Sequence, residues 1–231
     1  MEKQHIEEPL NRILESRHHD PFEVLGKHTL GEHTLARAFL PLAESASIVE
    51  SSLAMKRVEG TDFFEWYGAP EQVPQRYRIA WIDHRGQPHS SYDPYCFPPQ
   101  LKEIDLHLFN QGKHWHAYKI FGAHAHSTEG VQGVLFSVWA PNADRVSVVG
   151  DFNNWDGRIH SMRSRGGSGV WELFIPDVSP GNFYRFELRS KSGEILVKND
   201  PFGTHFQKRP ENAGIIAAAS EHLWNDGEWM S

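Results

Sequence analysis

The sequence is short of cysteine and of long apolar runs, and each shortage excludes a class of protein. Cys96 is the only cysteine among 231 residues, so no disulfide can form within the chain, and a reducing, cytoplasmic setting is expected. No run approaches the ~20 apolar residues that span a bilayer. Residues 1–8 also lack the apolar stretch and cleavage site of a signal peptide. We therefore expect a cytoplasmic protein with no membrane partner.

Positive charge is also scarce. The formal net charge is −7 at pH 7, whereas a nucleic-acid-binding surface is expected to carry a basic stripe. No nucleic-acid partner is therefore expected. Material for hydrophobic cores is ample, since 39% of the residues are hydrophobic and 12% are aromatic. A chain of 231 residues has room for two domains of about 100 residues each.

The hydropathy pattern predicts an all-β protein. Short runs of alternating apolar and polar residues are separated by Gly, Pro, Asn and Asp, which is typical of β-sandwiches. The expected strands form two sets, 33–40, 45–50, 61–67 and 76–82, then 131–140, 145–150, 169–175, 182–190 and 194–198. Apolar residues at helical spacing predict two short helices, one with a face of Ile6, Leu10, Ile13 and Leu14, and one over 99–111 with a face of Leu101, Ile104 and Leu108.

The two strand sets repeat one another in the same order, about 100 residues apart. The matching segments are Leu25–His28 with Phe121–His124, Ala36–Pro41 with Phe136–Pro141, Ser47–Val49 with Ser147–Val149, Phe64–Tyr67 with Trp171–Phe174, Tyr77–Ile79 with Tyr184–Phe186, and Asp93–Tyr95 with Asp200–Phe202. Such a series indicates a tandem duplication of a complete domain, because the units of solenoids are shorter.

We therefore predict two tandem immunoglobulin-like β-sandwiches with a short N-terminal helix and a helical connector. The first module with its leading helix is expected over residues 1–100, and the connector over 101–130. The second module is expected over 131–219, and a linker over 220–231.

The two copies differ after their second strand. The second copy runs Gly150-Asp-Phe-Asn-Asn-Trp-Asp-Gly-Arg158, where the first has Glu50-Ser-Ser-Leu-Ala-Met-Lys-Arg57. Sugars present apolar C–H faces and hydroxyl edges, which an aromatic ring and nearby amide or guanidinium groups can match. The alternative is structural: Trp155 folds back onto the sandwich while the Asn and Asp side chains form turn hydrogen bonds.

The residues around this loop resemble a known family. The run Phe136–Asp156 resembles carbohydrate-binding module family 48, which precedes the catalytic barrel in many enzymes of the α-amylase superfamily, glycoside hydrolase family 13. The additional upstream copy, with its run His19–His28, is similar to bacterial 1,4-α-glucan (glycogen) branching enzymes in particular. The resemblance covers nearly the whole chain.

The resemblance implies a carbohydrate site in the second module. Trp155 would stack on glucose, and Arg185 on a later strand would contact hydroxyls. The amides expected to assist are Asn153, Asn154 and Asn212. Related modules carry a second Trp just before an Asp-Pro pair, whereas this chain has no aromatic in residues 196–199. A weak site, or a surface that packs on the barrel, is therefore expected.

The resemblance places catalysis outside these residues. The family's catalytic Asp and Glu lie on a (β/α)₈ barrel of about 250 residues, and no carboxyl pair here is arranged for glycosidic chemistry. The implied parent enzyme cuts an α-1,4-glucan, holds the cut chain as a covalent glycosyl intermediate, and transfers it to a 6-hydroxyl as an α-1,6 branch. We expect no catalytic residue, metal or cofactor here, and no activity of the chain alone. The expected partners are α-glucan and the parent's catalytic barrel.

Two other motifs are set aside. His114 and His116, like His124 and His126, have a spacing that places them on one face of a strand, but no acidic or Cys cluster supports a metal site. The segment 165–169 is rich in Gly but lacks the Lys-Ser/Thr of a phosphate loop. It predicts a hairpin turn.

Two rival functions are compatible with these residues. One is a stand-alone glucan-binding module with no enzyme attached. The other is a purely structural or interaction domain whose aromatic loop packs on a neighbour. Glucan binding that depends on Trp155 distinguishes the first rival from the second, and a barrel encoded beyond Ser231 distinguishes the branching enzyme from both.

Overall fold

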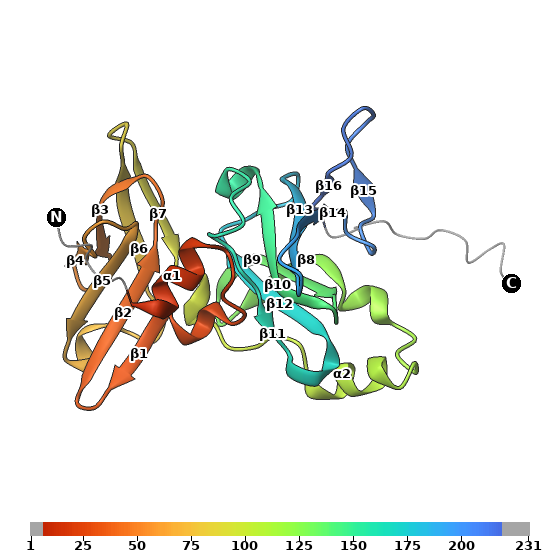
Figure 1. Ribbon diagram of the computed structural model, residues 1–231, viewed down its shortest axis with the longest axis horizontal. Coiled ribbons are helices and arrows are strands. Elements are labelled where there is room, and N and C mark those ends of the chain that lie inside the picture. The colour runs from red at the N-terminus through yellow and green to blue at the C-terminus, as the bar shows by residue number, and fades with distance from the viewer. Residues whose placement is uncertain (1–6, 219–231) are drawn as a thin grey trace, which may run out of the picture.

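The computed structural model describes residues 7–218 and shows two β-domains side by side (Figure 1). Helix α1 (Glu8–Leu14) precedes the first domain, and α2 (Glu103–Asn110) lies in the connector. The predicted all-β architecture with a short leading helix is confirmed. The expected linker, 220–231, lies outside the described residues. Within 7–218, no helix has the length and apolar character needed to cross a bilayer.

The first domain is one sheet folded into two layers. Its seven strands follow the order β1-β2-β5-β4-β3-β6-β7. Strand β4 serves both layers, because Lys56 pairs with Glu65 of β5 while Met55 pairs with Ala46 of β3. The strands are β1 (Gly26–Leu30), β2 (His33–Phe39), β3 (Ala43–Ile48), β4 (Leu53–Arg57), β5 (Phe63–Gly68), β6 (Arg78–Asp83) and β7 (Pro88–Tyr92).

The second domain is a sandwich of two separate sheets. A four-stranded sheet has the order β11-β12-β9-β8, and a five-stranded sheet has the order β10-β13-β16-β15 with β14 paired to β13. Buried Phe136 and Leu173 from the first sheet meet Val148 and Phe186 from the second. The strands are β8 (Gly122–Thr128), β9 (Val131–Trp139), β10 (Ala143–Gly150), β11 (Arg163–Ser164), β12 (Val170–Pro176), β13 (Phe183–Ser190), β14 (Ile195–Lys198), β15 (His205–Phe206) and β16 (Gly214–Ile215).

Single 3₁₀ turns join several of these strands. They are η1 (Pro21–Glu23), η2 (Pro70–Gln72), η3 (Pro94–Cys96), η4 (Ala117–Lys119), η5 (Asp151–Asn153) and η6 (Gly166–Ser168). Turn η6 connects the antiparallel pair β11 and β12, so the Gly-rich segment is the predicted hairpin turn.

The two domains share one topology, as the sequence repeat predicts. The pairings β1-β2-β5 and β3-β6-β7 of the first domain recur as β8-β9-β12 and β10-β13-β14 in the second. The main difference lies between the third and fourth strands. Residues 49–52 connect β3 to β4, whereas the longer segment 151–162 connects β10 to β11. The extra chain in the second copy is the loop that carries Trp155.

A buried tyrosine–aspartate hydrogen bond braces each domain in the same place. The Tyr77 hydroxyl donates to Asp93 Oδ2 at 2.6 Å, and the Tyr184 hydroxyl donates to Asp200 Oδ2 at 2.5 Å. In both copies the other carboxylate oxygen accepts the backbone N–H two residues later. Each brace therefore ties the start of an inner strand, β6 or β13, to the turn that ends the repeat.

An equivalent glycine opens each repeat beside this brace. Gly26 has φ +91° and Gly122 has φ +103°, values that disfavour any residue with a Cβ. A Cβ on Gly26 would lie 2.9 Å from the Tyr95 carbonyl oxygen, and one on Gly122 would lie 3.1 Å from Asp200 Oδ2. The repeated Leu/Phe-Gly-Lys/Ala-His motif is therefore a packing requirement of the fold.

The connector differs from its predicted form in two respects. Helix α2 packs through buried Leu106 and partly buried Phe109, while Ile104 is 56% exposed. The predicted face of Leu101, Ile104 and Leu108 is therefore wrong, and Leu101 is buried just before the helix. Residues 122–128, expected in the connector, form strand β8 and pair with β9. This edge strand alternates His with small residues rather than with large apolar ones.

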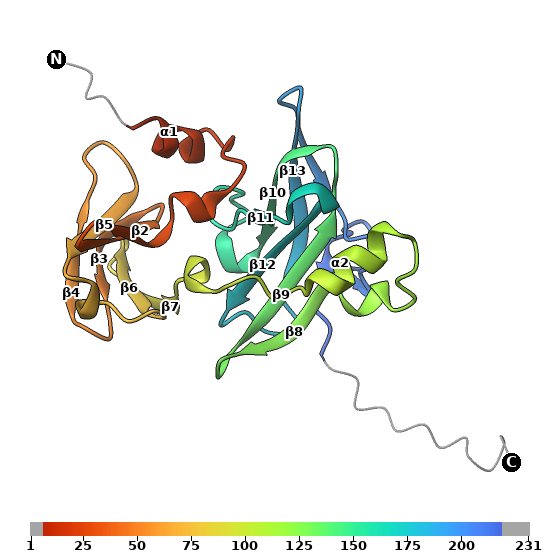
Figure 2. The ribbon, with the colours of Figure 1, turned by 90° about the horizontal axis from the view of Figure 1, so that it is seen from below.

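The two domains are packed against each other through the connector, which Figure 2 shows running from β7 across to α2. The Tyr95 hydroxyl donates to the Ile159 carbonyl at 2.8 Å, and Arg78 pairs with Asp177 at 3.1 Å. The Arg163 guanidinium lies over the Phe22 ring at 3.4 Å. One core cluster also continues from the first domain to Phe174 of the second. These contacts hold the domains at a set spacing.

The brace of the first domain predicts an unusual dependence of stability on pH. Burial raises the pKa of Asp93 from 3.8 to about 6 in the folded protein, although hydrogen bonds from Tyr77 and Tyr95 act in the opposite direction. The folded state therefore holds this proton more tightly than the unfolded chain, so stability falls as the pH rises between these two values. Relative to Asp93→Asn, the wild-type free energy of unfolding should fall by up to about 3 kcal/mol between about pH 4 and pH 7.

Urea unfolding of both proteins across this pH range measures the difference. A difference that stays constant with pH would contradict the raised pKa of Asp93.

Candidate functional site

The loop after β10 is fixed by the side chain of Asn153. Its Oδ1 accepts the Gly150 N–H at 2.9 Å, and its Nδ2 donates to the Val148 carbonyl at 2.8 Å and to His160 Nδ1 at 3.0 Å. Only 3% of this residue is exposed. The structure does not support the prediction that Asn153 contacts sugar, because every polar atom of its amide is already engaged within the fold.

A buried arginine holds the far end of the same loop. Arg145, from β10, donates to the Gly157 carbonyl at 2.5 Å and to Ser147 Oγ at 2.6 Å, and it pairs with Glu187. Its side chain is 1% exposed. A buried guanidinium that lost these partners would be costly. The sequence does not indicate this role of Arg145, because an arginine in a strand is normally expected to face solvent.

These two anchors present Trp155 at the surface. Asn154 and Trp155 both adopt positive φ, 54° and 60°, which turns the chain sharply after η5. The indole Nε1 donates to Asp151 Oδ1 at 3.3 Å, and 40% of Trp155 is exposed. The ring therefore does not fold back into the sandwich, as the structural alternative required.

Three of the predicted residues come together around this ring. The Arg185 guanidinium, from β13, lies 6.0 Å from the centre of the Trp155 ring. Its Nη2 donates to Oδ1 of Asn212, which lies just before β16. We call this group of Trp155, Arg185 and Asn212 the Trp155 face. It combines an aromatic surface with guanidinium and amide groups, the chemistry that a sugar ring with its hydroxyls requires.

The other positions considered in the sequence do not join the Trp155 face. Asn154 is exposed but lines a cavity that faces the first domain. Residues 196–199, just before Asp200, contain no aromatic residue. In this segment β14 has Val197, which is 49% exposed. The Trp155 face therefore has a single aromatic platform.

The histidine pairs that have metal-ligand spacing are engaged separately. His114 Nε2 bonds Asp105 at 3.0 Å, His124 Nε2 bonds the Phe121 carbonyl at 2.8 Å, and His126 Nε2 bonds Gln100 at 3.1 Å. Elsewhere in residues 7–218, His18, His19 and Glu23 have ligand atoms within 4.8 Å of one another. His18 Nδ1 accepts the Asp20 N–H, and the His18 ring stacks on His19. We therefore assign these histidines a structural role in the turn before η1.

Comparison with known proteins matches each domain to a family. Residues 6–95 match the family described as alpha-1,4-glucan branching enzyme GlgB, N-terminal domain. Residues 120–203 match carbohydrate-binding module 48 (isoamylase N-terminal domain).

Longer relatives align with nearly the whole chain. The 1,4-alpha-glucan branching enzyme GlgB of Cellvibrio japonicus is 50% identical over 99% of this chain and 33% of its own length. The enzyme of the same name from Methylococcus capsulatus is 51% identical over 95% and 30%. This chain thus spans about a third of the length of these relatives. Among solved structures, a pullulanase from Anoxybacillus sp. matches with a TM-score of 0.35 at 12% identity, covering 84% of this chain and 27% of its own.

The anchoring role of Asn153 predicts a loss of stability on substitution. Asn153→Ala removes three hydrogen bonds and leaves buried backbone groups without partners, so unfolding in urea should become easier by about 2–3 kcal/mol. Asn154→Gly is the matched control. It should change the free energy of unfolding by less than about 0.5 kcal/mol, since glycine adopts the same positive φ and the side chain is exposed. Equal losses for the two variants would show that Asn153 is not the anchor.

Proposed function

Because the chain joins a GlgB-type N-terminal domain to a carbohydrate-binding module of family 48, we infer that it is the N-terminal region of a 1,4-α-glucan branching enzyme. From this we propose that it is a non-catalytic glucan-binding region, in which the Trp155 face holds an α-glucan chain. The observation that carries the proposal is the convergence of Trp155, Arg185 and Asn212 from three separate segments.

The geometry supports a sugar ring rather than another small ligand. An exposed indole offers an apolar face to the C–H groups of glucose, while Arg185 and Asn212 offer hydrogen bonds to its hydroxyls. The face presents one cation within a chain of net charge −7, which gives little attraction to a polyanion. Stacking of a base on an aromatic residue contributes about 1–3 kcal/mol in nucleic-acid sites. If one sugar ring stacks with a comparable energy, a single platform binds each glucan segment weakly. A polymer offers many such segments, which raises the overall binding.

In this proposal the bond-forming chemistry belongs to another part of the parent protein. The relatives are about three times as long as this chain, and they are 1,4-alpha-glucan branching enzymes by name. Transfer of an α-1,4-glucan segment to a 6-hydroxyl in glycogen biosynthesis would then occur on a catalytic barrel. The present domains would position glucan chains and the barrel, in the cytoplasm. The single cysteine, Cys96, is buried, and burial raises its thiol pKa, in keeping with an unreactive packing role.

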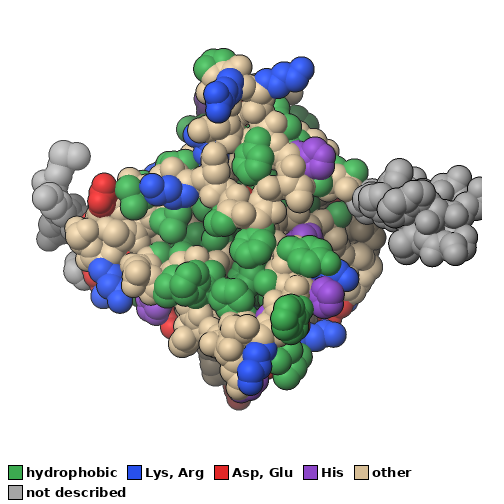
Figure 3. All heavy atoms as spheres, turned by 90° about the vertical axis from the view of Figure 1, so that its right-hand side faces the viewer, with side chains coloured by type: hydrophobic (Ala, Val, Ile, Leu, Met, Phe, Trp, Pro, Cys, Tyr) green, Lys and Arg blue, Asp and Glu red, His purple; other side chains and the backbone are tan. Residues whose placement is uncertain are grey.

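An apolar patch supports docking of the barrel to the second domain. Rings contact one another in the order Trp139, Phe109, Phe121 and Phe202, with centroid distances of 5.9, 4.5 and 5.2 Å. Trp139 is 52% exposed and Phe202 is 36% exposed. We call these four residues the Trp139 patch. Figure 3 shows hydrophobic side chains gathered on this side of the molecule.

Two further observations favour the barrel as the occupant of this patch. The loop between α2 and η4 adds another aromatic side chain to the second domain, Trp115, which is 91% exposed. The last described strand, β16, lies in the right-hand domain of Figure 1, the domain whose outer side faces the viewer in Figure 3. Exposed aromatic side chains gathered on one side of a domain mark an interaction site.

Glucan binding by this chain tests the proposal. Trp155→Ala should weaken binding of maltoheptaose about 5- to 150-fold, because loss of a stacking platform costs about 1–3 kcal/mol. Tyr67→Ala is the control, since Tyr67 is also an exposed aromatic (59%), stacked on His33 in the first domain. Titration calorimetry measures both. Unchanged affinity for Trp155→Ala would contradict the assigned site, and no binding by the wild type would favour a purely structural role.

The docking role predicts an effect that only a longer protein shows. In the full-length parent, Trp139→Lys should lower the melting temperature and the branching activity, because a charge would be buried against the barrel. In this chain alone it should cost less than about 1 kcal/mol, since the ring is half exposed. Ile82→Lys, at an exposed position of β6, should leave both proteins unchanged. Wild-type melting and activity of the full-length Trp139→Lys variant would place the barrel elsewhere.

A further inference from the structure

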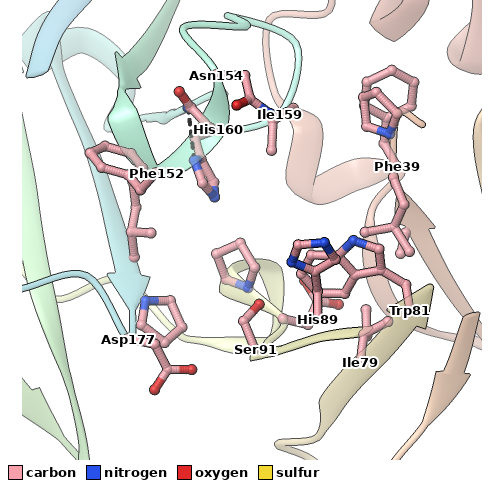
Figure 4. Close-up of a pocket in the computed structure, with 18 of the residues that line it drawn as sticks. Phe39, Ile79, Trp81, His89, Ser91, Phe152, Asn154, Ile159, His160 and Asp177 are labelled. Atoms are coloured by element: carbon pink, nitrogen blue, oxygen red, sulfur yellow. Dashed lines mark hydrogen bonds between the residues drawn. The ribbon is translucent and has the colours of Figure 1, made fainter. Parts of the chain in front are cut away.

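A cavity of about 450 Å³ lies between the two domains, separate from the Trp155 face. Figure 4 shows side chains of both domains pointing into it. Its size falls within the range of about 300–1,000 Å³ that is usual for small-ligand sites. The Arg78–Asp177 ion pair and the Tyr95–Ile159 hydrogen bond cross between the same walls. The space therefore belongs to the packed arrangement of the domains.

The wall from the first domain is aromatic with a polar rim. Trp81 of β6 and His89 of β7 stack with centroids 5.3 Å apart and planes 15° from parallel. His89 Nε2 bonds Asp83 Oδ2 at 2.9 Å, which fixes the imidazole against the indole. Ser91, next on the same face of β7, also lines the space, and Figure 4 shows it at the centre of the cavity wall.

The wall from the second domain offers an uncharged N–H donor. Asn153 uses Oδ1 as an acceptor and Nδ2 as a donor, so His160 Nδ1 accepts a hydrogen bond and the ring proton lies on Nε2. In Figure 4 the His160 ring points into the cavity, and no described residue bonds its Nε2. Burial lowers the pKa of His160 to about 4, so the ring is neutral at pH 7. Phe152 and Asn154 complete this wall.

The lining favours a neutral, polyhydroxylated ligand. Indole and phenyl groups match the C–H faces of a sugar, while the His160 N–H, the Ser91 hydroxyl and the Asn154 amide match its hydroxyls. The ionised groups nearest to the space include Asp83 and Asp177, which would repel a phosphate or other anion. The apolar residues alternate with these polar groups, so a purely hydrocarbon ligand would leave the polar groups without partners.

We propose that this interdomain cavity is a second α-glucan subsite, which binds a short α-1,4-linked segment between Trp81 and His160. The identity of the ligand rests on the proposed function of the Trp155 face. The loop 151–155 serves both sites, with Trp155 on one and Phe152 and Asn154 on the other. A glucan bound in the cavity contacts both domains and so stabilises their mutual orientation.

Nitrogen-15 NMR of this chain during titration with maltoheptaose reports each site separately, because Trp81 and Trp155 have distinct indole Nε1–H signals. We expect both signals to shift, together with that of His160 Nε2–H. Ser91→Phe fills the cavity from β7 without removing core contacts. It should abolish the shifts of Trp81 and His160 while leaving the Trp155 titration unchanged.

The matched control is Ser90→Phe, which places the same ring on the opposite face of the same strand, outside the cavity lining. It should preserve all three shifts. Shifts confined to Trp155 in the wild type, or cavity shifts that persist in Ser91→Phe, would overturn the proposal and leave the Trp155 face intact. Shifts of Trp81 and His160 without any at Trp155 would uphold the cavity and instead contradict the proposed function of the Trp155 face.

Discussion

The buried amide of Asn153 is the interaction on which the sites of this molecule depend. One side chain satisfies a backbone N–H, a backbone carbonyl and an imidazole nitrogen. The loop that follows β10 is thereby held in a single conformation, with Arg145 fastening its far end. The positive φ of Trp155 is maintained by this support, and so is the tautomer of His160. Without the anchor, neither the aromatic surface outside nor the donor inside the cavity would have a defined position.

Duplication explains how the two domains divide their roles. Both copies keep the tyrosine–aspartate brace and the glycine that packs beside it, because each fold needs them to tie an inner strand to its last turn. The first copy connects β3 to β4 through residues 49–52 and so has no room for an exposed loop. Its strands β6 and β7 instead supply one wall of the interdomain cavity. The second copy supplies the loop, the Trp155 face and the apolar patch.

Much of this could be predicted from the sequence, and the failures have physical reasons. The repeat and the alternating pattern were sufficient for the sandwiches, and Trp155, Arg185 and Asn212 do converge. The pattern could not show that Asn153 turns inward and Asn154 outward, because two adjacent amides differ only in backbone φ. The pattern does not predict strand β8, because an edge strand of His and small residues has no strong apolar alternation. The spacing of apolar residues favours a face with Ile104, whereas α2 packs through Leu106 and Phe109 and leaves Ile104 56% exposed.

The cavity could not be foreseen, because it depends on how two complete domains dock through Arg78, Tyr95 and Arg163. Sequence periodicity describes each domain's own core and carries no information on that docking. The central claim is that the second domain binds α-glucan on the Trp155 face. The most direct test is a crystal structure of this chain with maltoheptaose. We expect a glucose ring against the Trp155 indole with its hydroxyls on Arg185 and Asn212, and a bound oligosaccharide that avoids this face would contradict glucan binding there.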